Sequence, residues 1–398
     1  MSISFARLSL STTAVLAGVA AVALGAAPGA EAATGSTSSA PSATSSTSAS
    51  PAYRGSSDAV FVQNDNVSGN QVEVYQRAAD GTLSLVEGYA TGGLGGQLTG
   101  SVVDHLASQG SLTYDAAHHL LYAVNAGSNT VSVFAVDGLN LTLRQTVSSG
   151  GTFPVSVAVH GSTVYVLNAE NGGAVQGYRV EGGLLQLQSG WNRQLGLESD
   201  GTPQFTHTPG QVGFAANGSE LLVTTKAAGN DVYAYHLTSY GAPSRSVTVN
   251  SLPGTVPFSF VSTGWNQIAL VQAGTNAVVS YDVGSDGTLT QLSSFATGQA
   301  ATCWIADADG TLFASNAGSG DVTGLGVGTH GALTSLGNTS TDAGTVDAAA
   351  SPDGHYLYVQ TGGNGIVDEY RVAANGSLAK IGSQTVPNGV GDEGITVG

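Results

Sequence analysis

A strand–turn–strand pattern recurs along the chain and limits it to a repeat architecture. LLYAVNAGSNTVSVFAVDG at residues 120–138 is followed by related hairpins that begin at residues 312 and 357. The 43–61-residue spacing between successive copies is typical of a four-stranded propeller blade, with insertions in the first and third copies. Seven copies align at the anchor positions Asn64, Asn125, Asn168, Lys226, Ala273, Asn316 and Thr361.

Each copy predicts four strands. An inner strand such as SLTYD precedes a turn, the two strands of the hairpin, a second turn and a short outer strand. Alternating Val, Tyr, Phe and Thr favour strands, and Asp-Gly or Asn-Gly supplies the positive φ of tight turns. No stretch after the N-terminal leader has a sustained helical period.

The two ends of the repeat region complement each other. The first copy begins at DAVFVQND without an inner strand, and the chain ends in GDEGITVG, an inner-type strand. We expect ITV to complete the first blade, because closing the ring removes unpaired strand edges. The sequence thus predicts an all-β, seven-bladed β-propeller of antiparallel blades over residues 58–398. An open solenoid is the alternative, but the capping repeats that it needs are not evident.

The N-terminus resembles an export signal. Arg7, a short apolar run and an A-x-A site predict a secretory signal peptide over residues 1–33, cleaved near Ala32–Ala33. A membrane anchor is the alternative, but the run falls short of the roughly 20 residues of a span. Residues 34–57 are rich in Ser, Thr, Ala and Pro, which predicts a flexible tether. We therefore expect a secreted, extracellular protein without a transmembrane segment in its mature chain.

The charge balance excludes some partners. Ten Lys and Arg residues against 27 Asp and Glu give a net charge of −17, so the chain lacks the clustered cations that nucleic acids need. A single cysteine, Cys303, leaves no internal disulfide. No His/Cys spacing suggests zinc and no glycine-rich loop suggests a nucleotide, so we expect no metal and no cofactor. We also expect a monomer that binds a small molecule.

The repeats, read at the level of LYAVNAGSNTVSVF, resemble those of the lactonase-type seven-bladed propellers. This family includes 6-phosphogluconolactonase-like and carboxymuconate-cyclase-like enzymes and the YVTN-repeat surface proteins. The resemblance implies chemistry at one mouth of the central channel, carried by a Pro-Arg-His strand start and a later Asn-Glu. In the matching stretch, Gly210 and Gln211 stand where Arg and His would be, and Thr225 and Lys226 where Asn and Glu would be.

Other residues at the mouth are candidates for catalysis. The loop that enters an inner strand and the loop that leaves a second strand open on the same face of a propeller. His207, at the end of the long insertion, is the candidate general base, with a surface histidine as the alternative. Lys226 or Gln211 would stabilise an oxyanion. For Lys226, a structural pairing with an acid such as Asp347 is an equally weighted alternative.

A second set of residues would contact the substrate. Trp304 offers a stacking surface, and Cys303 beside it is expected to be inert. The three asparagines of this set follow strands, where capping of the next turn is the alternative to ligand contact. The set comprises Trp304, Asn125, Asn168, Asn316 and Asp347.

Two functions remain open from the sequence. The first is a lactonase-like protein that acts on, or binds, a small anionic ring or sugar lactone at the channel mouth. The second is a non-catalytic extracellular binding or adhesion module of the YVTN-repeat type. A degenerate paralogue that serves only as a scaffold is a third possibility. Whether the chain is an enzyme is therefore undecided at this stage, because propellers host many activities.

Overall fold

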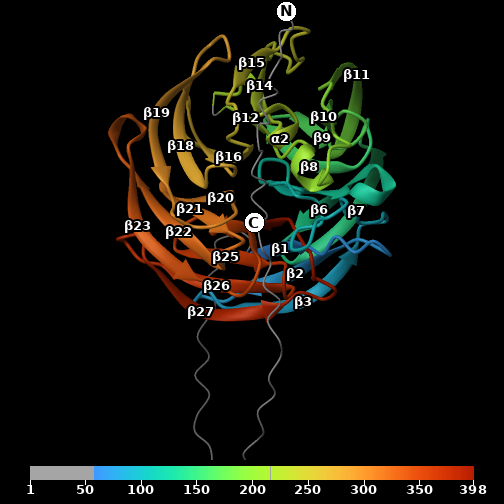
Figure 1. The fold of residues 1–398 in the computed structure, drawn as a ribbon. Coiled ribbons are helices and arrows are strands. Elements are labelled where there is room, and N and C mark those ends of the chain that lie inside the picture. Colours follow the sequence, from blue (N-terminus) through green and yellow to red (C-terminus); the bar gives the residue numbers. More distant parts are fainter. Residues whose placement is uncertain (1–57, 216) are drawn as a thin grey trace, which may run out of the picture. The chain divides into compact units, whose positions relative to one another are not determined.

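Seven four-stranded antiparallel blades form a ring around a central axis (Figure 1). The structure is a computed structural model that describes residues 58–215 and 217–398. The expected all-β propeller is confirmed, with each blade ordered from an inner to an outer strand. The signal peptide and tether expected over residues 1–57 lie outside the described residues.

The first four blades follow the chain from the described N-terminal end. Blade 1 contains β28 (Ile395–Val397), β1 (Ala59–Gln63), β2 (Gln71–Arg77) and β3 (Leu83–Ala90). Blade 2 contains β4 (Leu112–Asp115), β5 (Leu120–Asn125), β6 (Thr130–Asp137) and β7 (Asn140–Ser148). Blade 3 contains β8 (Pro154–His160), β9 (Thr163–Asn168), β10 (Ala174–Glu181) and β11 (Leu184–Gln194). Blade 4 contains β12 (Val212–Phe214), β13 (Glu220–Thr224), β14 (Asp231–His236) and β15 (Thr248–Ser251).

The remaining three blades continue the same order. Blade 5 contains β16 (Pro257–Gly264), β17 (Gln267–Gln272), β18 (Ala277–Val283) and β19 (Leu289–Ala296). Blade 6 contains β20 (Thr302–Ala308), β21 (Thr311–Asn316), β22 (Asp321–Val327) and β23 (Leu333–Ser340). Blade 7 contains β24 (Thr345–Ala350), β25 (Tyr356–Thr361), β26 (Ile366–Val372) and β27 (Leu378–Thr385).

Helical structure is confined to short segments. Within the described residues these are α1 (Gln204–His207), α2 (Lys226–Gly229) and the 3-10 turns η1 (Ala126–Ser128) and η2 (Thr329–Gly331). None of the described helices has the length and hydropathy that a membrane span requires.

The C-terminal strand closes the ring as the sequence predicts. β28 pairs antiparallel with β1, with Val60 opposite Val397 and Val62 opposite Ile395. The pairing brings the C-terminus to the middle of the ring (Figure 1). It gives β1 a hydrogen-bonded partner on each side, since β2 pairs with its other edge.

Burial follows the position of a strand within its blade. Every residue of the second strands β5 and β9 is buried, whereas most of the outer strand β7 is exposed. Neighbouring blades cover both faces of these second strands, which are therefore largely apolar along their whole length. The outer strands meet water on the rim of the ring.

Buried tyrosines join consecutive blades. The hydroxyl of Tyr178 in β10 donates to the Ser148 carbonyl of blade 2 at 2.6 Å. Tyr370 in β26 makes the equivalent bond to Ser340 of blade 6 at 2.8 Å. Because a buried tyrosine needs a partner for its hydroxyl, these bonds fix the orientation of one blade against the next.

Ring closure predicts that Ile395 contributes strongly to stability. Ile395 is 5% exposed and packs between blades, so Ile395→Ala should lower the free energy of unfolding by about 2–5 kcal/mol through lost contacts and a cavity. Urea denaturation measures the change. Val390→Ala, at a position 61% exposed, is the control and should stay within about 0.5 kcal/mol of the parent protein. Equal effects of the two substitutions would contradict the closure argument.

Candidate functional site

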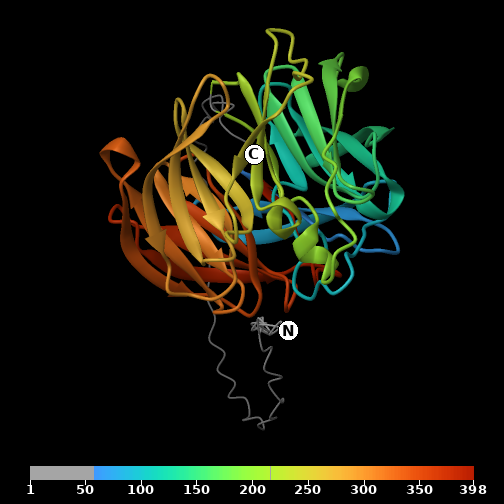
Figure 2. The ribbon, with the colours of Figure 1, turned by 45° about the horizontal axis from the view of Figure 1, so that its top comes forward.

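Two insertions lie on the mouth face of the ring. The first insertion, residues 91–110, precedes β4, and the second insertion, residues 195–210, precedes β12 and contains α1. Figure 2 shows α1 and α2 together at this face. The amide of Thr99 donates to the Gln204 side chain at 2.9 Å, which joins the two insertions. A cleft of about 320 Å³ lies between them, lined by Thr99, Gly100, Asp200, Gly201, Thr202, Pro203 and Gln204.

The end of the first insertion enters the channel. We call residues 104–109 the plug. The Trp304 indole in blade 6 donates to the Ser108 carbonyl at 2.6 Å, and both amide atoms of Gln109 bond to the backbone of Ile305 at 3.0 Å. The Gln109 N–H donates to the Gly210 carbonyl beside blade 4. The plug, which precedes blade 2, is thus bonded to blade 6 and to the second insertion beside blade 4.

Asp104 holds the plug in shape. Its carboxylate accepts hydrogen bonds from the N–H groups of Leu106 and Ala107 at 2.8 Å and of Ser108 at 3.2 Å. Such bonds stabilise the ionised carboxylate. Burial acts in the opposite direction and raises the pKa of Asp104 above its usual range. Lys226 lowers this pKa by its positive charge.

Lys226 connects the two insertions beneath the surface. Its side chain is 1% exposed, and its ammonium donates to the carbonyls of Ala107 at 2.6 Å and Phe205 at 2.7 Å and to the Thr208 hydroxyl at 3.1 Å. Three acceptors match the three N–H donors of an ammonium group. Burial lowers the pKa of Lys226, and the negative charge of Asp104 opposes that shift.

Four further carboxyl groups are buried around the plug. Burial raises the pKa of Asp65 to about 8 and raises the pKa values of Asp347, Asp392 and Glu393 above their usual ranges. Glu393 accepts a bond from the Ser108 hydroxyl at 2.9 Å. One oxygen of Asp392 and one of Glu393 have no hydrogen-bond partner among the described residues. Such groups are expected to bind protons as the protein folds.

Within residues 58–215 and 217–398, no three His, Cys, Asp or Glu side chains are arranged to hold a metal ion. The buried carboxyls therefore supply no cation site in their observed positions.

His207 ends α1 at the cleft between the insertions. Its Nδ1 lies 2.9 Å from the Pro203 carbonyl, which can only accept, so the neutral ring carries its proton on Nδ1. That tautomer leaves Nε2 able to accept a proton. The ring packs on Gly201, where an added Cβ would lie 2.5 Å from it. The structure thus places His207 beside the cleft and two residues after Phe205, which holds Lys226.

The other candidates lie deeper. Gln211 uses both amide atoms on the Phe260 backbone, at 2.6 and 3.1 Å, and so links blades 4 and 5. Trp304 is 4% exposed, with its ring edge-on to Phe258 at 5.0 Å and its N–H on the plug. Asp347 is buried and accepts from the N–H of Ala348 at 2.9 Å. Lys226 makes no ion pair among the described residues, with Asp347 or any other acid.

The three asparagines lie inside their blades. Asn125 donates to the hydroxyls of Thr130 and Ser132, and Asn316 donates to Asp321 and Thr323 on the following strand. Asn168 donates to the Ser149 carbonyl at 3.0 Å. These contacts give each side chain a structural partner, and their part in ligand contact stays a prediction.

Ser108 and Gln109 were not singled out from the sequence. They directly precede β4, so the rule that entering loops face the mouth applies to them as well. The same rule does identify Asp392 and Glu393, which directly precede β28. Burial raises the pKa of the Cys303 thiol to about 12, although the positive charge of Lys226 lowers it, so the thiol stays protonated.

Comparisons with known proteins agree with the fold. The sequence profile of the family described as lactonase, 7-bladed β-propeller, matches residues 69–191, within blades 1 to 3. No curated protein matches the sequence significantly. Together with the solved structures below, the profile match confirms the resemblance to the lactonase-type propellers.

Three solved structures illustrate the similarity. A provisionally assigned 6-phosphogluconolactonase from Bacteroides uniformis is 17% identical with a TM-score of 0.68, over 85% of this chain and 99% of that chain. The periplasmic gluconolactonase of Pseudomonas aeruginosa is 16% identical with a TM-score of 0.66, over 85% and 98%. A provisionally assigned 6-phosphogluconolactonase from Bacteroides fragilis is 17% identical with a TM-score of 0.65, over 85% and 97%. At these identities the likeness concerns the fold.

The buried carboxyls predict that stability falls as the pH rises from 5 to 7. A carboxyl whose pKa is raised on folding binds more protons in the folded state, so its contribution is complete at low pH and is lost as the pH approaches its folded pKa. For Asp65 this window runs from 3.8 to about 8. Each such group should lower the free energy of unfolding by up to about 1.4 kcal/mol per pH unit. Urea denaturation at pH 5, 6 and 7 measures the slope.

Asp392→Asn tests the origin of this slope. The amide cannot ionise, so the variant should show a shallower decline by about one proton. Asp80→Asn is the control, because the hydrogen bonds from Thr82 lower the pKa of that exposed carboxyl and it does not titrate between pH 5 and 7. A slope that is unchanged in Asp392→Asn would show that Asp392 is ionised throughout.

Removing the ammonium of Lys226 should loosen both insertions. Lys226→Met keeps the length of the side chain but leaves the Ala107 and Phe205 carbonyls without their donor. Hydrogen exchange of the plug and of α1 should become at least about tenfold faster, while the strands of blade 6 keep their protection. Lys380→Met is the matched control, since Lys380 pairs with Asp342 and Asp368 on the rim. Unchanged hydrogen exchange in the insertions of Lys226→Met would show that Lys226 does not hold the two insertions together.

Proposed function

We propose that this protein is an exported, lactonase-like propeller that takes a small anionic ring or sugar lactone at the channel mouth and hydrolyses the lactone. The observation that carries the proposal is the buried ammonium of Lys226 between the two insertions. A fully buried lysine is costly to fold and is typical of sites that bind or process charge. The fold of the lactonase-type propellers and the names of the similar structures support the same class of substrate.

The insertions must separate to admit a substrate. In the closed arrangement, the donors of Lys226 are occupied by two carbonyls and one hydroxyl. A carboxylate or phosphate is a stronger acceptor than a carbonyl, because hydrogen bonds between charged groups are about twice as strong. An anionic substrate can therefore take over the ammonium and release the Ala107 and Phe205 carbonyls.

The chemistry that follows uses water and two side chains. The Nε2 atom of His207 removes a proton from water as the water oxygen attacks the lactone carbonyl carbon. Lys226 donates to the oxyanion that develops on the carbonyl oxygen. The ring C–O bond then breaks, and His207 returns its proton to the leaving ring oxygen. The product is the open hydroxy acid.

A specific observation favours the alternative of a non-catalytic extracellular binding or adhesion module. The positions that would carry the family's Arg-His and Asn-Glu hold Gly210, Gln211, Thr225 and Lys226. Gln211 is engaged with the backbone of blade 5, and so is not a substitute base. On this alternative the mouth would hold a ligand without turning it over.

A lactone assay separates the two functions. We expect the purified protein to release acid from gluconolactone, 6-phosphogluconolactone or a carboxylated muconolactone in a pH-stat. His207→Ala and Lys226→Ala should each lower turnover by at least about a hundredfold, the usual effect of a lost general base or oxyanion donor. His355→Ala is the control, because this exposed histidine lies in a turn of blade 7 and should leave turnover unchanged.

Titration calorimetry measures whether the protein binds the same lactones when it does not hydrolyse them. Binding without acid release, weakened in Lys226→Ala, would replace the enzyme by the binding module. Neither binding nor release would overturn the assignment of the mouth as a lactone site.

A further inference from the structure

A second cleft lies between blades 3 and 4, on the face opposite the mouth. Its volume is about 470 Å³, larger than the cleft between the insertions. It is formed by the turn between β8 and β9, residues 217–219 before β13, and the loop after β14. These turns join strand ends that point away from the insertions, so the cleft is separate from the proposed lactone site.

The lining combines an arginine, hydroxyl groups and aromatic rings. Arg179 reaches the cleft from β10, and Ser162, Ser219 and Ser239 bring hydroxyls from three different turns. Phe214 forms one wall, with the His160 ring tilted against it at 5.4 Å between centroids. Hydroxyls beside an aromatic face match the polar edge and the apolar face of a sugar ring.

Arg179, unlike Arg77 and Lys380, has no acidic partner among the described residues. Arg77 pairs with Asp58, and Lys380 pairs with Asp342 and Asp368. In residues 58–215 and 217–398, Arg179 forms no ion pair and donates one hydrogen bond, to the Tyr240 carbonyl at 3.0 Å. The described lining contains no Asp or Glu, although the chain has 27 acids against ten Lys and Arg residues. The cleft is therefore suited to an anionic group.

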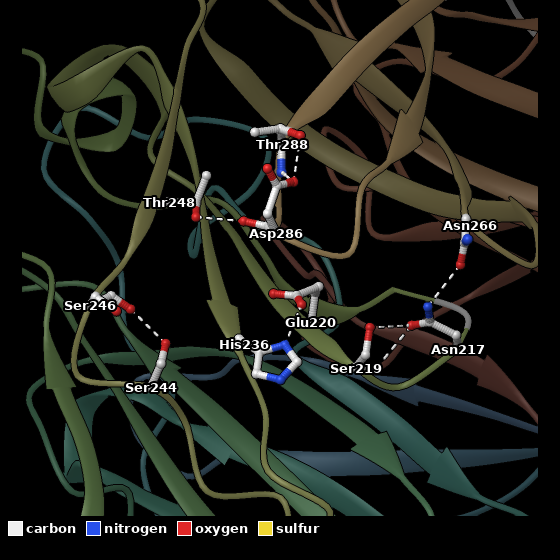
Figure 3. Close-up of polar contacts among 10 residues, drawn as sticks. All are labelled: Asn217, Ser219, Glu220, His236, Ser244, Ser246, Thr248, Asn266, Asp286 and Thr288. Atoms are coloured by element: carbon white, nitrogen blue, oxygen red, sulfur yellow. Dashed lines mark hydrogen bonds and ion pairs between the residues drawn. The ribbon is translucent and has the colours of Figure 1, made fainter.

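Two exposed aromatic residues adjoin the cleft. Tyr240 is 77% exposed and follows the lining residue Ser239. Trp265 is 76% exposed and precedes Asn266, which accepts a bond from Asn217 of the lining at 2.8 Å. Figure 3 shows Asn217 contacting both Asn266 and Ser219, near the pair formed by Glu220 and His236. Each of these exposed aromatic residues is thus adjacent in the chain to a residue that lines the cleft or bonds to its lining, and exposed aromatic rings are typical of binding surfaces.

We propose that this cleft binds an acidic saccharide chain. The carboxylate of one uronic acid unit pairs with the Arg179 guanidinium, and its hydroxyls bond to the serines of the lining. Neighbouring units stack on Tyr240 and Trp265. The proposal is independent of lactone hydrolysis, and it gives the protein a means of attachment to a glycan surface.

Titration calorimetry with trigalacturonate tests the proposal, with maltotriose as the neutral counterpart. We expect the full-length protein to bind trigalacturonate and to bind maltotriose at least about tenfold more weakly, because maltotriose lacks the carboxylates. Arg179→Ala should weaken trigalacturonate binding by at least about tenfold, and Arg179→Lys by less, since a lysine keeps the charge but loses the planar fork. Tyr240→Ala and Trp265→Ala should each weaken it several-fold.

Arg371→Ala is the matched control. Arg371 lies on the third strand of blade 7 and donates to the Asp80 carbonyl, as Arg179 does to Tyr240, but it is remote from the cleft. Binding should stay within about twofold of the parent protein, as expected for a surface charge outside the contact. Absence of trigalacturonate binding, or equal binding in Arg179→Ala, would overturn the proposal. Equal affinity for maltotriose would overturn the acidic class.

A cross-test keeps the two sites apart. His207→Ala should bind trigalacturonate like the parent protein, and Arg179→Ala should keep whatever lactone turnover the parent shows. Loss of saccharide binding in His207→Ala would place the ligand at the mouth instead and overturn the proposal.

Discussion

The pairing of β28 with β1 is the constraint on which the other features depend. It joins the two ends of the described chain in one blade and leaves that blade with four strands. Closure fixes the channel, because an open ring would leave β1 without a partner on one side. It also carries Asp392 and Glu393 to the channel, since they directly precede β28. The buried acidic set at the mouth is thus a consequence of how the ring is closed.

Polar backbone groups that are buried at the centre of a closed ring need hydrogen-bond partners within the protein, and the folded plug supplies them. Backbone groups of residues 104–109 must find partners once they leave water, and the carboxylate of Asp104 provides three of them. Lys226 satisfies carbonyls from both insertions with one ammonium. These bonds are made by charged groups, so they are strong while the mouth is closed and open to competition from an anionic ligand. The blades can therefore stay folded while an anionic ligand replaces the hydrogen bonds that hold the two insertions to Lys226.

Much of the fold could be predicted from the sequence, because the determinants are local and repeated. The hairpin of LLYAVN and TVSVFAVD is observed as β5 and β6 over the expected residues. The mouth was less predictable. Its contacts join positions as distant as Ser108 and Trp304, and the insertions carry no periodic pattern from which such contacts follow. Lys226 and Gln211 could be identified from their positions in the repeat, but their hydrogen-bond partners could not. Lys226 bonds to Phe205, whose place depends on how an irregular insertion folds, and Gln211 bonds to Phe260, whose place depends on the packing of adjacent blades.

The two faces of the ring differ in how accessible their positive charge is: Lys226 is buried at the mouth, whereas Arg179 lines a cleft on the opposite face. This difference argues for separate roles. At the mouth, the buried ammonium of Lys226 lies near the carboxyls of Asp104 and Glu393 and is held by neutral acceptors. On the opposite face, Arg179 keeps most of its donors available at a cleft without a carboxylate. An anion reaches Lys226 only by displacing protein groups, which favours a small ligand and a gated reaction. It reaches Arg179 directly, which favours an extended ligand and simple attachment. The same blade repeat supports both arrangements, because the turns at its two ends vary independently of the strands between them.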